Sequence, residues 1–321
     1  MTTAQYLAAE LIAVVVAATA GEPRVLTILD GTALPSGPFE LGHRSLQSGL
    51  RTWVEEQTHH PLGYVEQLYT FADRDRLWAA GGRRAISISY LGLTRETEPP
   101  GQNAAGWRNW YSYFPWEDHR WGAPAVTADL LAPALRSWAE SVPENDAQAA
   151  RGRRVAIAFG LDGQPWNEEL ILQRYELLYE AALVPEAWRD AERTRAADKA
   201  SPPPRAARQV APGLPMTSDH RRILATGIAR LRAKIKYRPV VFELMPDSFT
   251  LFQLQRAVEG IAGRAVHKQN FRRLVEQQEL VEETGETTGL TGGRPAKLFR
   301  FRREILAERS ITGTKLPVIR A

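Results

Sequence analysis

The chain has 321 residues, 44% of them apolar and 24% charged, and it contains no cysteine. This composition is typical of a globular protein of about two domains, and it excludes disulfide frameworks, thiolate nucleophiles and cysteine-ligated zinc. The net charge of +4 is unevenly distributed, because residues 216–303 carry 17 basic and 9 acidic side chains whereas residues 1–215 carry 21 and 26. A basic C-terminal part favours contact with a polyanion; the alternative is a charge that serves solubility only.

The first apolar run, at residues 11–18, is interpreted as a buried strand. No positive charge precedes it and Glu10 interrupts its N-terminal side, which argues against a secretion signal. The run is also too short to span a membrane. We therefore expect a cytoplasmic protein with no membrane partner. A second β-rich run at residues 24–29 follows a turn signal, Gly21-Glu22-Pro23.

The next segments mix helix and strand patterns. A helix is predicted at residues 45–57, where Ser45 can cap it and apolar residues recur at helical spacing. Further strands are predicted at residues 64–71, 84–93 and 153–160. Further helices are predicted at 127–141 and 167–184, a long loop at 97–123 and a proline-rich linker at 190–215. Because no regular βαβ repeat occurs, the pattern favours an α+β or three-layer domain.

The C-terminal part follows the order of a winged helix-turn-helix. Helices are predicted at residues 218–236, 251–261 and 268–278, and strands at 280–283 and 296–301. In this motif the recognition helix lies in the major groove, where Arg and Lys suit guanine edges and Asn and Gln suit adenine edges. The predicted DNA contacts are Lys268, Gln269, Asn270, Arg272, Arg273, Arg294 and Lys297. Phe271 and Leu274 are expected to face the core. The alternative is a solvated basic helix beside a plain hairpin.

Four C-terminal segments resemble the winged-helix domain of the NrtR family, the Nudix-related regulators of NAD metabolism. They read DHRRILATGIARLRAKIKY, FTLFQLQRAVEGIAG, KQNFRRLVEQQELVEETG and GRPAKLFRF. The resemblance implies a winged helix at residues 216–303 that binds double-stranded operator DNA. A homodimer is expected, because two recognition helices can then read half-sites about one helical turn apart.

The N-terminal part resembles a degraded Nudix domain. GYVEQLYTFADRDR, at residues 63–76, resembles the segment that follows the Nudix box in the same family. That box reads G, five residues, E, seven residues, then R-E-U-x-E-E-x-G, where U is a bulky aliphatic residue. With its first glycine set on Gly37, the matched positions are Arg51, Glu55 and Glu56. The lost positions are His43 and Thr52, which replace Glu, and Thr58, which replaces Gly.

The lost carboxylates bear on catalysis. Pyrophosphate hydrolysis by Nudix enzymes uses divalent cations held by carboxylates on one face of a helix. Thr52 cannot contribute a carboxylate to that face, so we expect a domain that binds a nucleotide, needs no metal and is not an enzyme. The alternative for Glu55 and Glu56 is a solvated helix face.

The predicted ligand-binding residues are Arg51, Glu55, Glu56, Arg74, Arg76, Trp107 and Arg108. Trp107 opens an aromatic-rich stretch at residues 107–121. Aromatic faces can stack on adenine and arginines can hold phosphate. For a regulator of NAD metabolism, which the resemblance implies, the expected effector is an adenine nucleotide: ATP, NAD(H) or ADP-ribose. The alternatives are aromatic packing inside the domain, or at a dimer interface, and surface ion pairs.

These observations combine into one hypothesis. The fold is α+β, with a Nudix-like α/β/α sandwich followed by a winged helix. The expected domains are a nucleotide-sensing domain at 1–195, a linker at 196–215, the winged helix at 216–303 and a tail at 304–321. In its length and degraded box the chain resembles the NadQ group of repressors, which implies a repressor of NAD-biosynthesis genes.

Two other functions remain open at this point. The first is an active Nudix hydrolase of ADP-ribose or a related dinucleotide with an accessory DNA-binding domain. The second is a DNA-binding protein whose first domain is purely structural and senses no nucleotide.

Overall fold

A computed structural model describes residues 8–72, 85–97, 105–198, 211–289 and 295–302. The predicted contacts Arg74, Arg76 and Arg294 lie outside the described residues. The chain forms two compact units. The sheet unit comprises residues 1–109, 233–261 and 266–321, and the helical unit comprises residues 110–232 and 262–265. None of the helices in the described part of the chain combines the length and the hydropathy that a membrane span requires.

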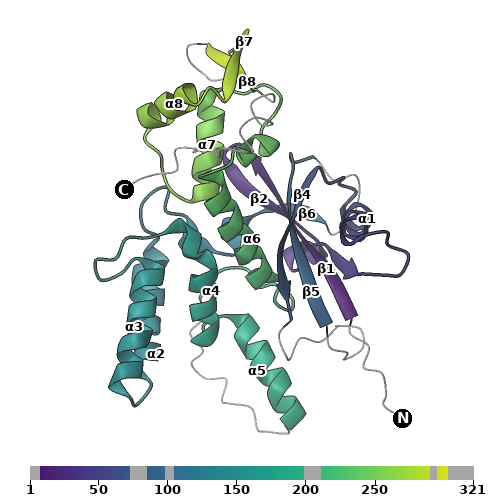
Figure 1. Cartoon of the computed structure of the whole chain (residues 1–321). Helices are drawn as coiled ribbons and strands as arrows, with labels where there is room; N and C mark the ends of the chain where they lie inside the picture. The colour runs from purple at the N-terminus through teal and green to yellow at the C-terminus, as the bar shows by residue number, and fades with distance from the viewer. Residues whose placement is uncertain (1–7, 73–84, 98–104, 199–210, 290–294, 303–321) are drawn as a thin grey trace. The chain divides into compact units, whose positions relative to one another are not determined.

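The sheet unit is built on a mixed β-sheet with the strand order β4-β5-β1-β2-β6 (Figure 1). The strands are β1 (Ala8–Thr19), β2 (Glu22–Thr27), β4 (Tyr64–Phe71), β5 (Ala85–Leu93) and β6 (Gly106–Asn109), and the short β3 (Ser36–Pro38) also pairs with β1. Strand β1 pairs in parallel with β5 and antiparallel with β2. Residues 11–17 of β1 are fully buried, which explains their continuous apolar run.

Helix α1 (Leu46–Thr58) packs on one face of this sheet (Figure 1). Leu50 and Val54 belong to the same buried cluster as residues of β1. Ser45 and Ser48 form a reciprocal capping box, in which the side chain of each accepts the backbone N–H of the other. This cap satisfies backbone donors that the first turn leaves unpaired. The strand predicted at 11–18 and the helix predicted at 45–57 are confirmed.

The helical unit contains short turns and α-helices. A π-helical turn (Thr127–Leu131) precedes α2 (Ala132–Glu140), and α3 (Asn145–Phe159), α4 (Ile171–Glu180), α5 (Pro185–Asp198) and the first part of α6 (His220–Ile235) follow. Two 3-10 turns, Trp110–Ser112 and Pro115–Glu117, open the unit. Trp110, Tyr113, Phe114 and Trp116 are buried, so these rings of the aromatic-rich stretch pack internally.

Three sequence predictions are wrong in this region. The strand predicted at 153–160 is the end of α3, where Val155, Ala158 and Phe159 are buried at helical spacing. A short apolar run fits either element, and here the Ala-rich segment before it extends the helix. The long loop predicted at 97–123 contains β6 and two 3-10 turns. The linker predicted at 190–215 begins as helix, because α5 continues to Asp198.

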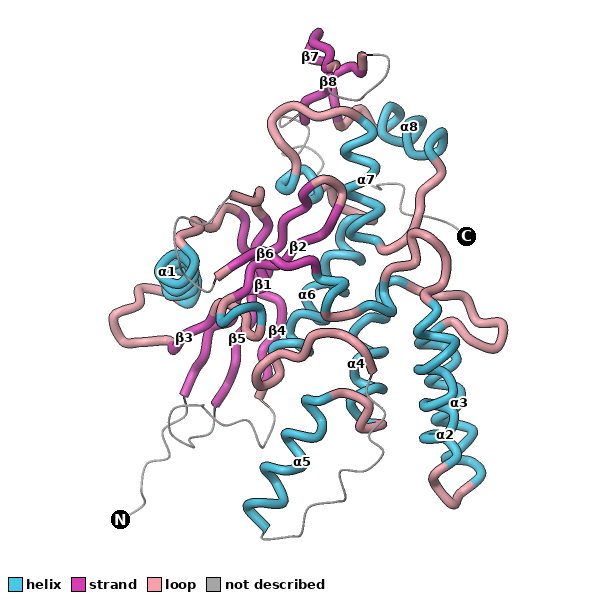
Figure 2. Tube along the Cα trace, turned by 180° about the vertical axis from the view of Figure 1, so that it is seen from behind, coloured by secondary structure: helices cyan, strands magenta, loops and turns pink. Residues whose placement is uncertain are grey.

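The C-terminal elements have the predicted winged-helix order (Figure 2). They are the 3-10 turn η6 (Val240–Leu244), α7 (Leu251–Ala262), α8 (Lys268–Gln277), β7 (Val281–Thr288) and β8 (Ala296–Phe301). Thr250 caps α7, since its hydroxyl accepts the Gln253 N–H at 3.1 Å. Phe249 exchanges two backbone hydrogen bonds with Phe299 of β8, at 2.9 and 2.8 Å, and thereby adds a short third strand to the hairpin.

Candidate functional site

The exposed side of α8 carries most of the predicted DNA contacts. Phe271 and Val275 are fully buried and anchor the helix, while Leu274 is half-buried. The predicted contacts on this helix are all exposed: Lys268, Gln269, Asn270, Arg272 and Arg273. Its three cations form no ion pair with any other residue that the structure describes. The helix therefore presents ammonium, guanidinium and amide groups that are available to phosphates and base edges.

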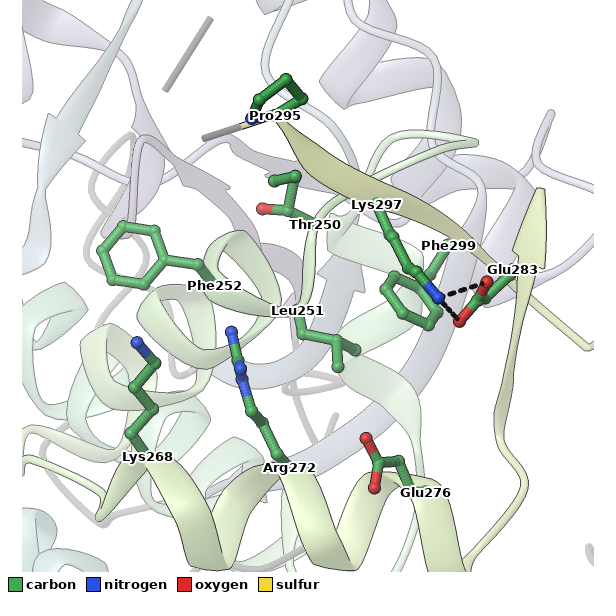
Figure 3. A pocket seen from close by; sticks show the side chains of 11 residues that line it. Thr250, Leu251, Phe252, Lys268, Arg272, Glu276, Glu283, Pro295, Lys297 and Phe299 are labelled. Atoms are coloured by element: carbon green, nitrogen blue, oxygen red, sulfur yellow. Dashed lines mark hydrogen bonds and ion pairs between the residues drawn. The ribbon is translucent and has the colours of Figure 1, made fainter. Parts of the chain in front are cut away.

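A hollow of about 620 Å³ lies between the start of α7, α8 and the β7–β8 hairpin (Figure 3). Its lining comprises Thr250, Leu251 and Phe252 of the α7 start, Lys268, Arg272 and Glu276 of α8, and Glu283, Pro295, Ala296, Lys297 and Phe299 of the hairpin. The side chains of Lys268 and Arg272 both extend from α8 toward the start of α7 (Figure 3). Because the first N–H groups of a helix are unpaired, this end of the hollow is electropositive.

Lys297 differs from the cations of α8 because it has a partner. Its ammonium contacts both carboxylate oxygens of Glu283 across the hairpin, at 2.8 and 3.0 Å (Figure 3). A phosphate that binds Lys297 must compete with Glu283 for the same ammonium.

Two buried polar residues of α7 fix the segment that leads into α8. The Gln255 amide donates to the Val266 carbonyl and to Glu259 Oε1, each at 3.0 Å. The same Glu259 oxygen accepts the Val266 N–H at 3.0 Å. Both side chains are at most 7% exposed. Both the N–H and the carbonyl of Val266, just before α8, are therefore hydrogen-bonded to buried side chains of α7.

Arg51, a matched position of the Nudix box, is engaged within the fold. Its guanidinium donates to the carbonyls of Leu62 and Gly63, the latter at 2.9 Å, and so ties α1 to the start of β4. Glu55 and Glu56 lie exposed on the same helix. Among the described residues, no group of three or more His, Asp or Glu side chains is arranged to hold a metal ion.

The box glycine Gly37 lies directly against the ring of Trp53. A Cβ atom at Gly37 would lie 2.3–2.6 Å from ring atoms of Trp53, so only glycine fits. The Trp53 indole N–H donates to the Pro38 carbonyl at 2.8 Å, which fixes the ring. His43, which stands in the place of a box glutamate, accepts the Glu40 N–H through Nδ1 at 3.0 Å.

The remaining described ligand candidates lie on the edge strand β6. Trp107 is 9% exposed, belongs to the core cluster and donates its indole N–H to the Thr97 carbonyl at 3.2 Å. The His60 ring meets the Trp107 ring edge-on at 5.5 Å. Arg108 is exposed. The structure thus places the candidates on two elements, α1 and β6, and their assignment to a ligand stays a prediction.

The C-terminal elements are similar to those of known proteins. Residues 241–301 match the family model of the NrtR DNA-binding winged helix domain. A curated protein of Acinetobacter baylyi, the ADPR responsive transcriptional repressor NtrR, is 40% identical to the chain over 88 residues. The winged helix of this chain is therefore similar to the NrtR DNA-binding domain. The match covers 27% of this chain and 35% of the Acinetobacter protein, so it spans only about a third of that relative.

Solved structures extend the similarity from the winged helix to the fold of most of the chain. NrtR of Shewanella oneidensis, crystallised with a 27mer DNA, is 19% identical and superposes with a TM-score of 0.51 over 91% of this chain and 93% of that one. A MutT/nudix family protein of Enterococcus faecalis is 15% identical, with the same TM-score over 94% and 89%. At these identities the likeness shows the fold alone, a Nudix-like fold with a winged helix, and it confirms the predicted α+β class.

Sequence reasoning missed the residues that orient α8. Gln255 and Glu259 are two polar residues, four apart on an otherwise apolar helix face, and this spacing is a usable signal. Their common partner, Val266, could not be predicted from the sequence, because they bind its backbone groups, which every residue type carries.

Proposed function

We propose that this protein is a transcriptional repressor whose winged helix binds operator DNA under the control of an adenine nucleotide. The observation that carries the proposal is the exposed face of α8, where Lys268, Arg272 and Arg273 have no ion-pair partner among the described residues. This helix lies inside the segment that matches the NrtR DNA-binding domain. Phosphate contacts position such a helix in the groove, and base-edge contacts from Gln269, Asn270 and the arginines supply sequence preference.

ADP-ribose is the favoured effector among the three nucleotides considered. The Acinetobacter relative is described as ADPR responsive, and ATP and NAD(H) share its adenosine and pyrophosphate groups. We assign effector binding to residues 1–195 and DNA binding to residues 216–303. We further propose that the repressor acts as a homodimer on NAD-biosynthesis genes. An effector can change DNA affinity only if it binds the DNA-competent and DNA-incompetent forms unequally.

The Nudix-like part is proposed to bind nucleotide without hydrolysing it and without a metal. Thr52 stands where the box has a glutamate, and it donates its hydroxyl to the Ser48 carbonyl at 3.1 Å. The box arginine, Arg51, is engaged by backbone carbonyls. These features support nucleotide sensing over the hydrolase reading.

The direct test is fluorescence anisotropy on labelled promoter DNA of NAD-biosynthesis genes at fixed salt. It is run without nucleotide and with ADP-ribose, ATP or NAD. The proposal predicts specific binding whose Kd shifts with ADP-ribose more than with the other two. Specific binding that no nucleotide shifts would reduce the protein to a plain DNA-binding protein. Release of AMP from ADP-ribose in the presence of magnesium or manganese would instead support the hydrolase.

A further inference from the structure

The connection between α7 and α8 is packed against a loop of the helical unit. Gly263 follows α7 and has φ +73°, a left-handed conformation that favours glycine. A Cβ atom there would lie 2.5 Å from the Glu117 carbonyl oxygen, 2.8 Å from Arg232 Nη2 and 3.0 Å from the Tyr111 hydroxyl. The turn backbone is therefore in direct contact with this loop, and no side chain separates them.

Polar contacts fix the same turn. The His119 N–H donates to the Gly263 carbonyl at 2.7 Å, and His119 and Arg264 form an isolated parallel β-bridge. Arg264 Nη1 lies 3.5 Å from the Glu168 carboxylate, which is almost fully buried. Three kinds of contact thus hold two consecutive residues of the turn, and α8 begins only four residues after Arg264.

A buried ion cluster fixes the loop itself. The Glu117 carboxylate is fully buried and binds two fully buried arginines: Arg174 donates to it through Nε and Nη2, and Arg232 through Nη1 at 2.5 Å. Arg232 also donates to the Glu168 carbonyl at 2.9 Å. Burial by itself would raise the pKa of Glu117, but Arg174 and Arg232 outweigh it and lower that pKa. Glu117 is therefore kept ionised between two arginines, and removing its carboxylate would leave two buried guanidinium charges without that partner.

The central ion cluster holds the loop, and Arg264 joins the turn to the edge of that cluster. Arg264 is partly exposed and pairs with the almost fully buried carboxylate of Glu168, whereas Glu117 is paired by Arg174 and Arg232. Its contact with Glu168 serves to hold the turn. Within the helix-turn-helix, residues 262–265 of the turn belong to the helical unit, whereas α8 belongs to the sheet unit.

We propose that the helical unit, through Glu168, His119 and the Glu117 cluster, positions the turn of the helix-turn-helix and thereby sets the affinity of α8 for DNA. This inference rests on the proposed DNA-binding function. Glu168 and Arg264 are positioning residues, which act on DNA through the backbone at 263–264.

Glu168→Gln separates positioning from general electrostatics. The variant is isosteric and makes the protein more positive, so charge alone would strengthen DNA binding. Positioning predicts the opposite: the operator Kd rises by about threefold to fivefold because the Arg264 contact weakens. The matched control is Glu180→Gln, which removes an equal charge from the exposed pair with Arg154 in the same unit. Circular dichroism and Tm verify that both variants fold.

Arg264→Ala is the second variant, with Arg154→Ala as its charge-matched control. Positioning predicts a Kd increase beyond that of the control at an unchanged slope of log Kd against log salt. A direct phosphate contact by Arg264 would flatten that slope by about one unit and would count against positioning. The inference is overturned if Glu168→Gln binds operator DNA as tightly as the wild type. Absence of operator binding by the wild type would refute the proposed function itself.

Discussion

The ammonium of Lys234, near the end of α6, contacts the Glu66 carboxylate and the Tyr64 hydroxyl at the start of β4. Tyr64 also donates to Glu66 at 2.6 Å. Arg51 of the Nudix-box helix binds the two carbonyls immediately before Tyr64. Within the sheet unit, the helix that leads into the winged helix is therefore linked through a half-buried ion pair to the strand that α1 supports.

Lys234→Met should reduce the response of DNA binding to nucleotide. The Lys234–Glu66 pair joins α6 to the strand that α1 supports. With the nucleotide bound at α1 as proposed, loss of this pair is expected to lower the ratio of Kd values with and without ADP-ribose by about threefold. Anisotropy titrations of both forms measure that ratio. Arg230→Met is the control, because it removes an exposed cation from the same helix. An equal ratio in Lys234→Met and the wild type would contradict this role.

Glu117→Gln should strongly destabilise the protein. It leaves Arg174 and Arg232 fully buried with only a neutral amide between them. Breaking a buried ion pair from one side costs about 3–5 kcal/mol, whereas an exposed pair contributes at most about 1 kcal/mol. Urea unfolding of this variant beside Glu180→Gln measures both free energies of unfolding. Equal losses in the two variants would mean that burial of the cluster is not maintained in solution.

His119 should make stability depend on pH in the acid range. Burial lowers its pKa to about 4, from an ordinary value of 6.5. Between pH 6.5 and pH 4 the unfolded chain binds a proton at this position and the folded chain does not. The contribution of His119 to the free energy of unfolding is therefore fully present above pH 6.5 and is lost as the pH falls toward 4. His119→Phe keeps a ring to stack on Trp166, where the centroids are 3.9 Å apart, and removes the titration.

The expected result is a smaller loss of unfolding free energy between pH 7 and pH 4.5 in His119→Phe than in the wild type. Urea titrations at the two pH values give the comparison. His60, whose pKa burial also lowers, contributes equally to both proteins and cancels. An equal loss of unfolding free energy in the two proteins would contradict a lowered pKa of His119.

Gly37→Ala should destabilise the sheet unit. The new methyl group would overlap the Trp53 ring, and overpacking of this kind costs about 1–3 kcal/mol. Gly42→Ala is the control, because a Cβ atom there meets nothing within 4 Å. Adding Trp53→Leu to Gly37→Ala should recover part of the loss, as measured by Tm. An unaffected Tm in Gly37→Ala alone would contradict the packing of Gly37 on Trp53.

The sequence predicted those elements whose signals are local. Ser45 and Thr250 cap helices as their position suggests, and Phe271 faces the core where helical spacing puts it. The Glu117–Arg232 pair could not be predicted from the sequence, because its partners are 115 positions apart in the chain. The strand predicted at 153–160 failed because five apolar residues fit a helix equally well.

The candidate site was predicted unevenly for the same reason. The polar face of α8 follows from residue types and helical period alone. The burial of Trp107 depends on its indole N–H reaching Thr97 and on His60 packing against its ring, and both contacts arise only from the sheet. The clamp of Gln255 and Glu259 on Val266 is likewise a product of the folded turn.

DNA binding through α8 is the central claim, and Arg272→Ala and Arg273→Ala test it most directly. Each is compared with Arg153→Ala, which removes an exposed arginine of α3 and controls for net charge. The measurement is the Kd for operator and for scrambled DNA across a salt series. We predict a loss of about 1–3 kcal/mol on operator DNA where a base edge is contacted, or a uniform loss with a slope flatter by about one unit where a phosphate is contacted. If both variants bind DNA as tightly as Arg153→Ala, the claim that α8 lies in the DNA groove is contradicted.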